Sequence, residues 1–335
     1  MCAKHNAKRP YEKHVWRERS QNNALSASAD AQADTERLHS SMTVTDRNFR
    51  GIADLPIIAQ LLDQARDLVG HGDGYLHAGD LWWRYGQYEP ELHQFRLWFH
   101  DDALIAFGWV IAEKNLELQL HPSLTETEFD ALAQQIVDWA KRVCPIEIIT
   151  ECTTHHSRLM RLLESRGFVR TAAEGLDYLL DLNAPLPDAE LPAGFQARSV
   201  LEPEFAERVS VHRDAFNPSK FTLERYARVR GMVGYRADLD LVIATPDNEL
   251  AAFCLVWLSN GAGVFEPVGT RAAWRRRGLG RAVILEGLKR LKQLGAHTAC
   301  VYSFAHNRAF YEACGFVVAN HWHSYAFKQV ANSGS

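Results

Sequence analysis

Residues 274–281 read Trp274-Arg275-Arg276-Arg277-Gly278-Leu279-Gly280-Arg281. Gly263 to Thr270 before them has the pattern of a strand, and Arg281 to Leu294 after them has the apolar face of a helix. Two glycines one residue apart let the backbone turn tightly and point successive N–H groups at one place. The positive end of the following helix faces the same place. The pattern therefore predicts a loop that binds a phosphate group.

The glycine spacing excludes two common phosphate loops. A Rossmann loop needs a third glycine where this chain has Val283, and a Walker loop needs Gly-Lys-Ser/Thr, which does not follow here. The remaining alternative is that the arginines form a solvated basic patch beside an ordinary turn, and a motif this short leaves it open.

The spacing of Arg275, Gly278 and Gly280 resembles the Arg/Gln-x-x-Gly-x-Gly signature of the GCN5-related N-acetyltransferases (GNAT). The resemblance covers Phe195 to Phe327 well and Phe49 to Leu182 faintly. It implies that the loop holds the pyrophosphate of acetyl-CoA and that the preceding strand pairs with the pantetheine arm. The cofactor-binding residues implied in this way are Val268, Gly269, Thr270, Arg275, Arg276, Arg277, Gly278, Leu279, Gly280 and Arg281.

The chain also repeats itself. Asp101 to Phe107 matches Asp247 to Phe253, and Glu164 to Val169 matches Glu312 to Val317. With the resemblance, this repeat predicts an α/β fold of two GNAT-type domains. Each would have a mixed, mainly antiparallel twisted sheet flanked by helices, with a splayed central strand pair. The expected division is a disordered extension at 1–45, a degenerate domain at 46–182, a proline-rich linker at 183–194 and a catalytic domain at 195–330.

The first copy lacks the loop. Its matching segment, residues 123–130, contains neither glycine nor arginine, and Glu126, Glu128 and Asp130 would repel a phosphate at a helix start. We therefore expect only the second copy to bind acetyl-CoA.

Two residues are candidates for acid–base chemistry. Glu266 lies on the strand before the loop, where an apolar setting would raise its pKa and suit it as the base that deprotonates an amine, directly or through water. The alternative is a rim carboxylate paired with an arginine. Tyr311, before Gly315-Phe316, matches the tyrosine that protonates the coenzyme A thiolate in the family, and its alternative is a core aromatic.

A third residue, Asn307, is carried over as a cofactor contact. Relatives usually place an asparagine seven residues before the tyrosine, where this chain has Phe304. Asn307 is the nearest asparagine, and it is equally suited to cap the helix that contains Tyr311.

Composition narrows the classes of function. The chain has 335 residues, a formal charge of -4 and 47% hydrophobic residues, which disfavours nucleic-acid binding and fits a globular protein. There is no apolar run long enough for a membrane span, and the cysteine spacing suggests neither disulfides nor a metal site. We expect a cytoplasmic protein without a bound metal, and we expect the histidines in surface or core roles.

The leading prediction is an acetyl-CoA-dependent N-acetyltransferase acting on a small-molecule amine, with Glu266 as base and Tyr311 as acid. The alternative keeps the fold without the chemistry, as a non-catalytic acyl-CoA-binding or regulatory protein. The sequence indicates neither the acceptor amine nor the oligomeric state.

Overall fold

The computed structural model describes residues 43–70, 74–188 and 190–329. Residues from Val44 onward form one compact unit. Most of the predicted extension, residues 1–42, lies outside the described residues. The first described strand, β1 (Val44–Asn48), includes the last two residues of that predicted extension. The domain boundaries at residues 182 and 195 stay a prediction.

In the described chain, twelve strands form a single sheet in the order β1-β2-β3-β4-β5-β12-β6-β11-β10-β9-β8-β7. Most neighbours are antiparallel, and β4–β5 and β10–β11 are parallel. The strands after β1 are β2 (His93–His100), β3 (Ala103–Ile111), β4 (Asn115–Leu120), β5 (Glu147–Thr153), β6 (Val169–Asp181), β7 (Gln196–Ser199), β8 (Asp240–Ala244), β9 (Leu250–Ser259), β10 (Ala262–Thr270), β11 (Thr298–Phe304) and β12 (Val317–Lys328).

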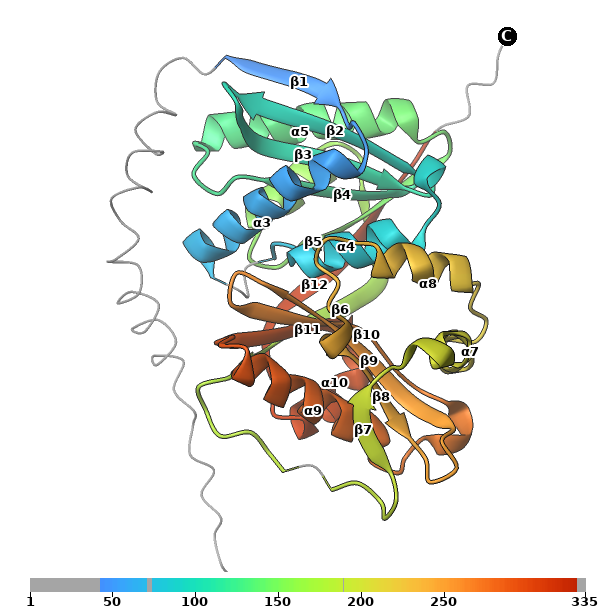
Figure 1. Cartoon of the computed structure of the whole chain (residues 1–335). Helices are drawn as coiled ribbons and strands as arrows, with labels where there is room; N and C mark the ends of the chain where they lie inside the picture. The colour runs from blue at the N-terminus through green and yellow to red at the C-terminus, as the bar shows by residue number, and fades with distance from the viewer. Residues whose placement is uncertain (1–42, 71–73, 189, 330–335) are drawn as a thin grey trace, which may run out of the picture. The chain divides into compact units, whose positions relative to one another are not determined.

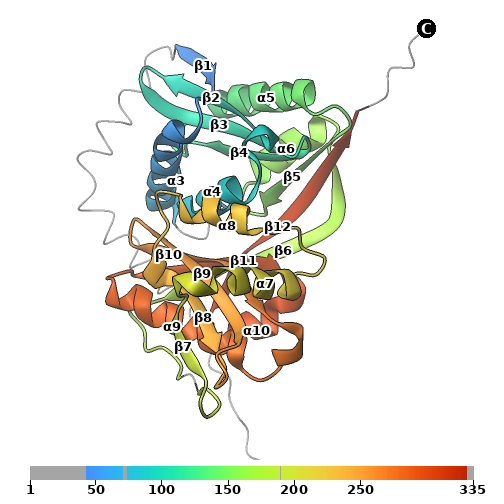
Figure 2. The same cartoon turned by 45° about the vertical axis from the view of Figure 1, so that its right-hand side comes forward.

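Helices cover both faces of this sheet (Figures 1 and 2). One apolar core joins α3, α4 and α8 to strands of both halves, and a second core joins α9 and α10 to the opposite face of the second half. The α-helices of the described chain are α3 (Leu55–Val69), α4 (Ala78–Gln87), α5 (Glu126–Val143), α6 (Ser157–Ser165), α7 (Phe205–Ala215), α8 (Leu223–Arg230), α9 (Leu279–Gln293) and α10 (Arg308–Ala313).

The two halves exchange their last strands. β6, the last strand of the first half, pairs with β11 of the second, with Asp177 opposite Tyr302. β12, the last strand of the chain, lies between β5 and β6. Each half of the sheet is therefore completed by a strand from the other, which explains why one sheet runs through the whole described chain.

The central parallel pair of each half separates early. The β10–β11 ladder runs from Ala262 opposite Thr298 to Val264 opposite Cys300 and then stops. The β4–β5 ladder is shorter and ends at Leu116 opposite Thr150. The splayed central pair predicted from the sequence is thus present in both halves.

Helix α4 of the first half packs against β9 and β10 of the second. His77 begins the helix: its Nδ1 accepts a hydrogen bond from the Gly79 N–H, and its Nε2 lies 3.0 Å from the Ala262 carbonyl of β10. A Cβ at Gly79 would lie 2.3 Å from Trp257 Cβ and 2.6 Å from Val264 Cγ1. Only glycine permits this close approach of the helix to the sheet.

We predict that Gly79→Ala lowers the free energy of unfolding by about 1–3 kcal/mol, the usual cost of overpacking. Alanine is the better helix former by about 1 kcal/mol, but a carbon 2.3 Å from Trp257 Cβ must displace α4 or the sheet. Urea denaturation would measure the change. Gly231→Ala is the control, since its Cβ would come no closer than 3.3 Å to another atom; equal stability of the two variants would contradict the close packing of α4.

Candidate active site

The predicted phosphate loop leads directly into α9. Gly278 is the N-cap residue, and its φ of 78° is the left-handed conformation that glycine adopts without strain. No side chain caps this helix and its first turn contains no acidic residue. The N-terminal N–H groups and the positive end of the helix dipole therefore remain available for an anion.

The four arginines of the loop have different surroundings. Arg275 donates to the carbonyls of Thr270 and Ala215, and Arg281 donates to those of Ala313 and Asp188. These two side chains brace the loop against the end of β10, α7 and α10, so the structure gives them a structural contact that the sequence did not predict.

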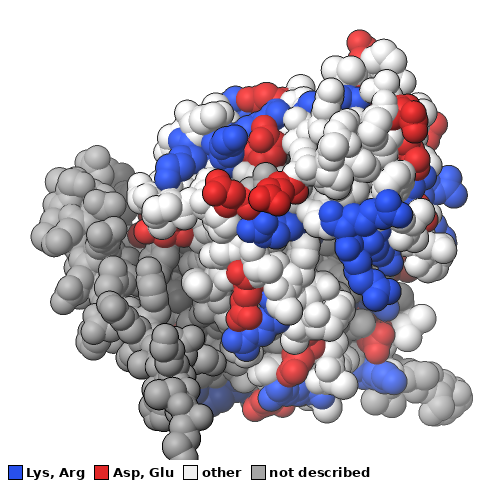
Figure 3. Space-filling view, turned by 90° about the horizontal axis from the view of Figure 1, so that it is seen from below, with Lys and Arg blue, Asp and Glu red and all other residues white. Residues whose placement is uncertain are grey.

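Arg276 and Arg277 lie on the outer side of the loop and are exposed. The Arg277 guanidinium lies over the Trp274 ring, 4.7 Å from its centroid. On the face seen from below in Figure 3, Lys and Arg side chains gather in one larger group and elsewhere alternate with Asp and Glu. This face therefore has one local basic group rather than a broad basic surface.

Gly280 faces the gap between the end of β10 and α10. A Cβ there would lie 3.0 Å from Thr270 Oγ1 and 3.4 Å from the Phe310 ring. Beyond Val264 the edge of β10 toward β11 has no ladder partner, while Val268, Gly269 and Thr270 pair with β9 on the other edge. The free edge thus ends beside the start of α9, where an extended ligand arm could pair with it.

Glu266 lies on this splayed part of β10, on the face that α4 covers. Burial raises its pKa, the Asp80 charge raises it as well, and Arg84 partly offsets both, so that the pKa is about 8. Among the described residues Glu266 forms no salt bridge, but the Arg84 charge acts on it, so its roles as a base and as a rim carboxylate beside an arginine both stay predictions. A half-buried carboxylate with this pKa is suited to accept a proton near neutral pH.

Tyr311 is 7% exposed and packs against Tyr178, with the ring centroids 5.0 Å apart. Burial raises its pKa well above the ordinary value, the nearby Ser303 side chain lowers it in part, and the Glu266 charge raises it again. The phenol therefore keeps its proton at neutral pH and can donate it.

Asn307 stands at the N-cap position of α10 but forms no side-chain cap; its amide donates to Ser303 Oγ at 3.0 Å. Ser303 of β11 thus connects Asn307 with Tyr311. Ser303 could not be predicted from the sequence, because a lone serine at the end of a strand carries no motif.

The equivalent position in the first half is closed. Thr125 Oγ1 accepts from the Glu128 N–H, and the Glu128 carboxylate accepts from the Thr125 N–H, which forms a capping box at the start of α5. Arg158 further pairs with Glu126 and Asp130. The helix start that would bind a phosphate is thus satisfied by the chain's own side chains.

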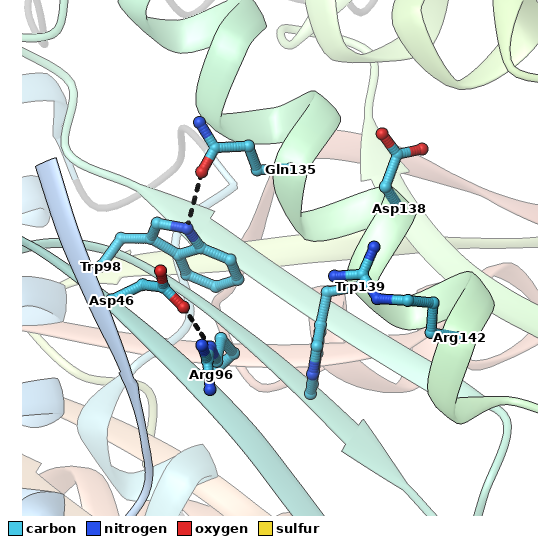
Figure 4. Close-up of a pocket in the computed structure, with 7 residues that line it drawn as sticks. All are labelled: Asp46, Arg96, Trp98, Gln135, Asp138, Trp139 and Arg142. Atoms are coloured by element: carbon cyan, nitrogen blue, oxygen red, sulfur yellow. Dashed lines mark hydrogen bonds and ion pairs between the residues drawn. The ribbon is translucent and has the colours of Figure 1, made fainter.

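A hollow of about 450 Å³ lies elsewhere in the first half, between the β1–β2 edge and α5 (Figure 4). Trp98 donates to Gln135, and Arg96 pairs with Asp46. Two arginines and two aspartates line it, so its charges balance, and it contains none of the predicted site residues.

The described helices include no segment with the length and apolar composition of a membrane span.

Comparisons with known proteins agree with this geometry. Residues 206–316 match the family model described as the acetyltransferase (GNAT) family. No curated protein matches the chain in sequence.

Several solved structures share its fold. A GCN5-related N-acetyltransferase from Sphaerobacter thermophilus has a TM-score of 0.60 and 18% identity, covering 85% of this chain and 95% of that one. A tandem GNAT protein from the clavulanic acid biosynthesis pathway has a TM-score of 0.60 and 12% identity, covering 85% and 98%. A GNAT-family acetyltransferase from Colwellia psychrerythraea has a TM-score of 0.55 and 14% identity, covering 85% and 100%. At these identities the likeness concerns the fold alone. The chain therefore has the fold of tandem GNAT proteins, and residues 206–316 in its second half match the acetyltransferase (GNAT) family model.

Proposed function

We propose that this protein transfers the acetyl group of acetyl-CoA to a small-molecule primary amine, using the second half of the chain alone for the donor. The open start of α9 carries the proposal, because it lies beside the free edge of β10 whereas the matching helix of the first half caps itself. The loop at residues 275–281 would hold the pyrophosphate, and Val268, Gly269 and Thr270 the pantetheine arm.

Glu266 and Tyr311 transfer the protons of the proposed reaction. Glu266 takes a proton from the ammonium form of the acceptor, because an ammonium has no lone pair with which to attack. The neutral nitrogen then forms its bond to the thioester carbon, and the carbon–sulfur bond breaks. Tyr311 gives its proton to the departing thiolate, and the second proton that the nitrogen loses as the amide forms restores the phenol. The products are the amide and free coenzyme A, and the proton taken up by Glu266 is released to solvent.

An acyl-CoA-binding protein without turnover is the second candidate. The observation in its favour is Phe304, which is 51% exposed where relatives place an asparagine, while the Asn307 amide is already engaged by Ser303. The position that relatives use for a polar contact to the donor is therefore apolar in this chain.

Calorimetry with acetyl-CoA, followed by release of free thiol with a panel of primary amines, separates these functions. We expect acetyl-CoA to bind with a dissociation constant of about 1 μM to 1 mM, the usual range for substrates, and at least one amine to be turned over. Binding without turnover on any amine would favour the second candidate. Absence of binding would refute both.

A further inference from the structure

Five carboxylates from both halves of the chain converge on the face of the sheet that α4 covers. Arg84 of α4 lies among them, 3.7 Å from Asp80 and 3.3 Å from Glu117, and the charges of Glu151 and Glu266 also act on it. The Asp177 carboxyl is influenced in turn by Asp80 and Glu151. We call this group the acidic cluster; its members are Asp80 on α4, Glu117 on β4, Glu151 on β5, Asp177 on β6 and Glu266 on β10.

The cluster is located where the sheet opens. Glu117 and Glu151 are the residues directly after Leu116 and Thr150, the last pair of the β4–β5 ladder. Glu266 lies two residues past the last pair of the β10–β11 ladder. In each half, carboxylates thus lie where the central parallel strands separate. The exchanged strand β6 places Asp177 between these two regions of the sheet.

The cluster has more negative than positive groups. Its neighbouring cations are Arg84 and Arg66, and the Arg66 guanidinium donates to the Tyr302 hydroxyl at 2.8 Å and to the Tyr75 carbonyl at 3.0 Å. Burial raises the pKa of Glu117 and of Asp177 to about 7. Near neutral pH these two carboxyls are therefore only partly ionised. An added cation would stabilise their ionised forms.

Two buried acceptors, one in the cluster and one beside it, lack a donor. Asp80 and Gln119 are 2% and 5% exposed, and neither Asp80 Oδ2 nor Gln119 Oε1 has a hydrogen-bond partner within the described chain. The Gln119 amide nitrogen donates to Glu117 Oε1 at 2.7 Å, which fixes the free oxygen at the cluster. Buried acceptors of this kind cost free energy unless a donor satisfies them, and an ammonium group brings three donors.

The cluster is open to a solute and unsuited to a metal ion. The Arg84 side chain is 29% exposed, and Glu151 is exposed although protein atoms around it raise its pKa. The described residues contain no group of three His, Cys, Asp or Glu side chains placed to hold a metal ion. The occupant that fits is an organic cation long enough to reach several separated carboxylates.

We propose that the acceptor is a small diamine or polyamine, with its reacting nitrogen at Glu266 and a second, protonated nitrogen held by Asp80, Glu117, Glu151 and Asp177. The proposal rests on the N-acetyltransferase function above and gives the first half a role in binding the acceptor. The second nitrogen takes no part in the chemistry and keeps its proton throughout.

The test compares butylamine with 1,4-diaminobutane, which has the same carbon chain and one more amine. We expect kcat/KM to be at least on the order of tenfold higher for the diamine, because hydrogen bonds to charged groups contribute about 1.5–3 kcal/mol. Glu151→Gln should raise KM for the diamine on the order of tenfold and affect butylamine much less. Asp247→Asn, an exposed carboxylate outside the cluster, should change neither constant.

Equal kcat/KM for the two amines in the wild type would overturn the proposal, as would equal losses on both amines in Glu151→Gln. If neither amine is turned over, calorimetry with 1,4-diaminobutane decides. Binding that weakens in Glu151→Gln would retain the diamine site but reject its role in holding the acceptor, whereas no binding would reject the diamine site whatever the protein does with acetyl-CoA.

Discussion

Gly280→Glu is expected to weaken acetyl-CoA binding by ~100-fold or more, because like charges brought together at a binding site cost several kcal/mol and each 1.4 kcal/mol is a factor of ten. The new carboxylate would stand at the second residue of α9, between Thr270 and Phe310, where the pyrophosphate is proposed to lie. The glutamate would also occupy the N–H groups that the phosphate needs. Calorimetry on the purified variant measures the effect.

Two further variants show whether the effect is local. Gln293→Glu adds one carboxylate at the exposed far end of the same helix and should leave acetyl-CoA affinity unchanged. Because Gly280 is buried and its substitution can disturb packing, the double variant Arg276→Glu, Arg277→Glu tests the same site from exposed positions. If the double variant binds acetyl-CoA as well as the wild type, or if Gln293→Glu binds as poorly as Gly280→Glu, the loop is not the donor site.

The elements around this site could be predicted because their signals are local. The helix expected at 281–294 is observed as α9 (Leu279–Gln293), and the strand expected at 263–270 as β10 (Ala262–Thr270). Glycine spacing, apolar periodicity and the absence of acidic residues all lie within a short segment. The capping box of the first copy is also local, formed by Thr125 and Glu128, although the sequence was interpreted there only as acidic residues that repel a phosphate.

The strand exchange could not be predicted, because it depends on pairing between strands far apart in the sequence, and no local pattern in β6 or β12 indicates which half each strand joins. The bracing of Arg275 by the Ala215 carbonyl and of Arg281 by the Asp188 carbonyl depends on segments far away in the sequence. Carbonyl groups are the same at every residue, so no pattern of side chains indicates them.

The acidic cluster was missed for a related reason. Its members come from five different elements, and each is a single carboxylate among residues of ordinary polarity. Asp177 lies near the other four carboxylates only because β6 pairs with β11 of the second half. Of the five, only Glu266 was predicted from the sequence, because it lies on the strand directly before the recognisable loop at residues 275–281.

Glu266→Gln is expected to lower kcat by about 10²–10⁴-fold, the usual contribution of general base catalysis. Glutamine keeps the size of the side chain and removes only the basic oxygen, so acetyl-CoA binding should persist. Glu249→Gln, on an exposed turn of the same half, is the control and should retain full activity. A Glu266→Gln enzyme as active as the wild type would remove Glu266 from the mechanism.

The pH profile gives the sharper distinction between the two proposed groups. Burial raises the pKa of Glu266 to about 8, and a base acts only when ionised, so wild-type kcat/KM should rise with pH and level off above about 8. Tyr311→Phe should lower kcat yet keep this rise, because the phenol supplies a proton at the later step and does not titrate in this range. Glu266→Gln should lose the rise altogether. A wild-type profile that is flat between pH 6 and 9, or a rise that survives in Glu266→Gln, would show that another group, or the amine itself, sets the ionisation on which the reaction depends.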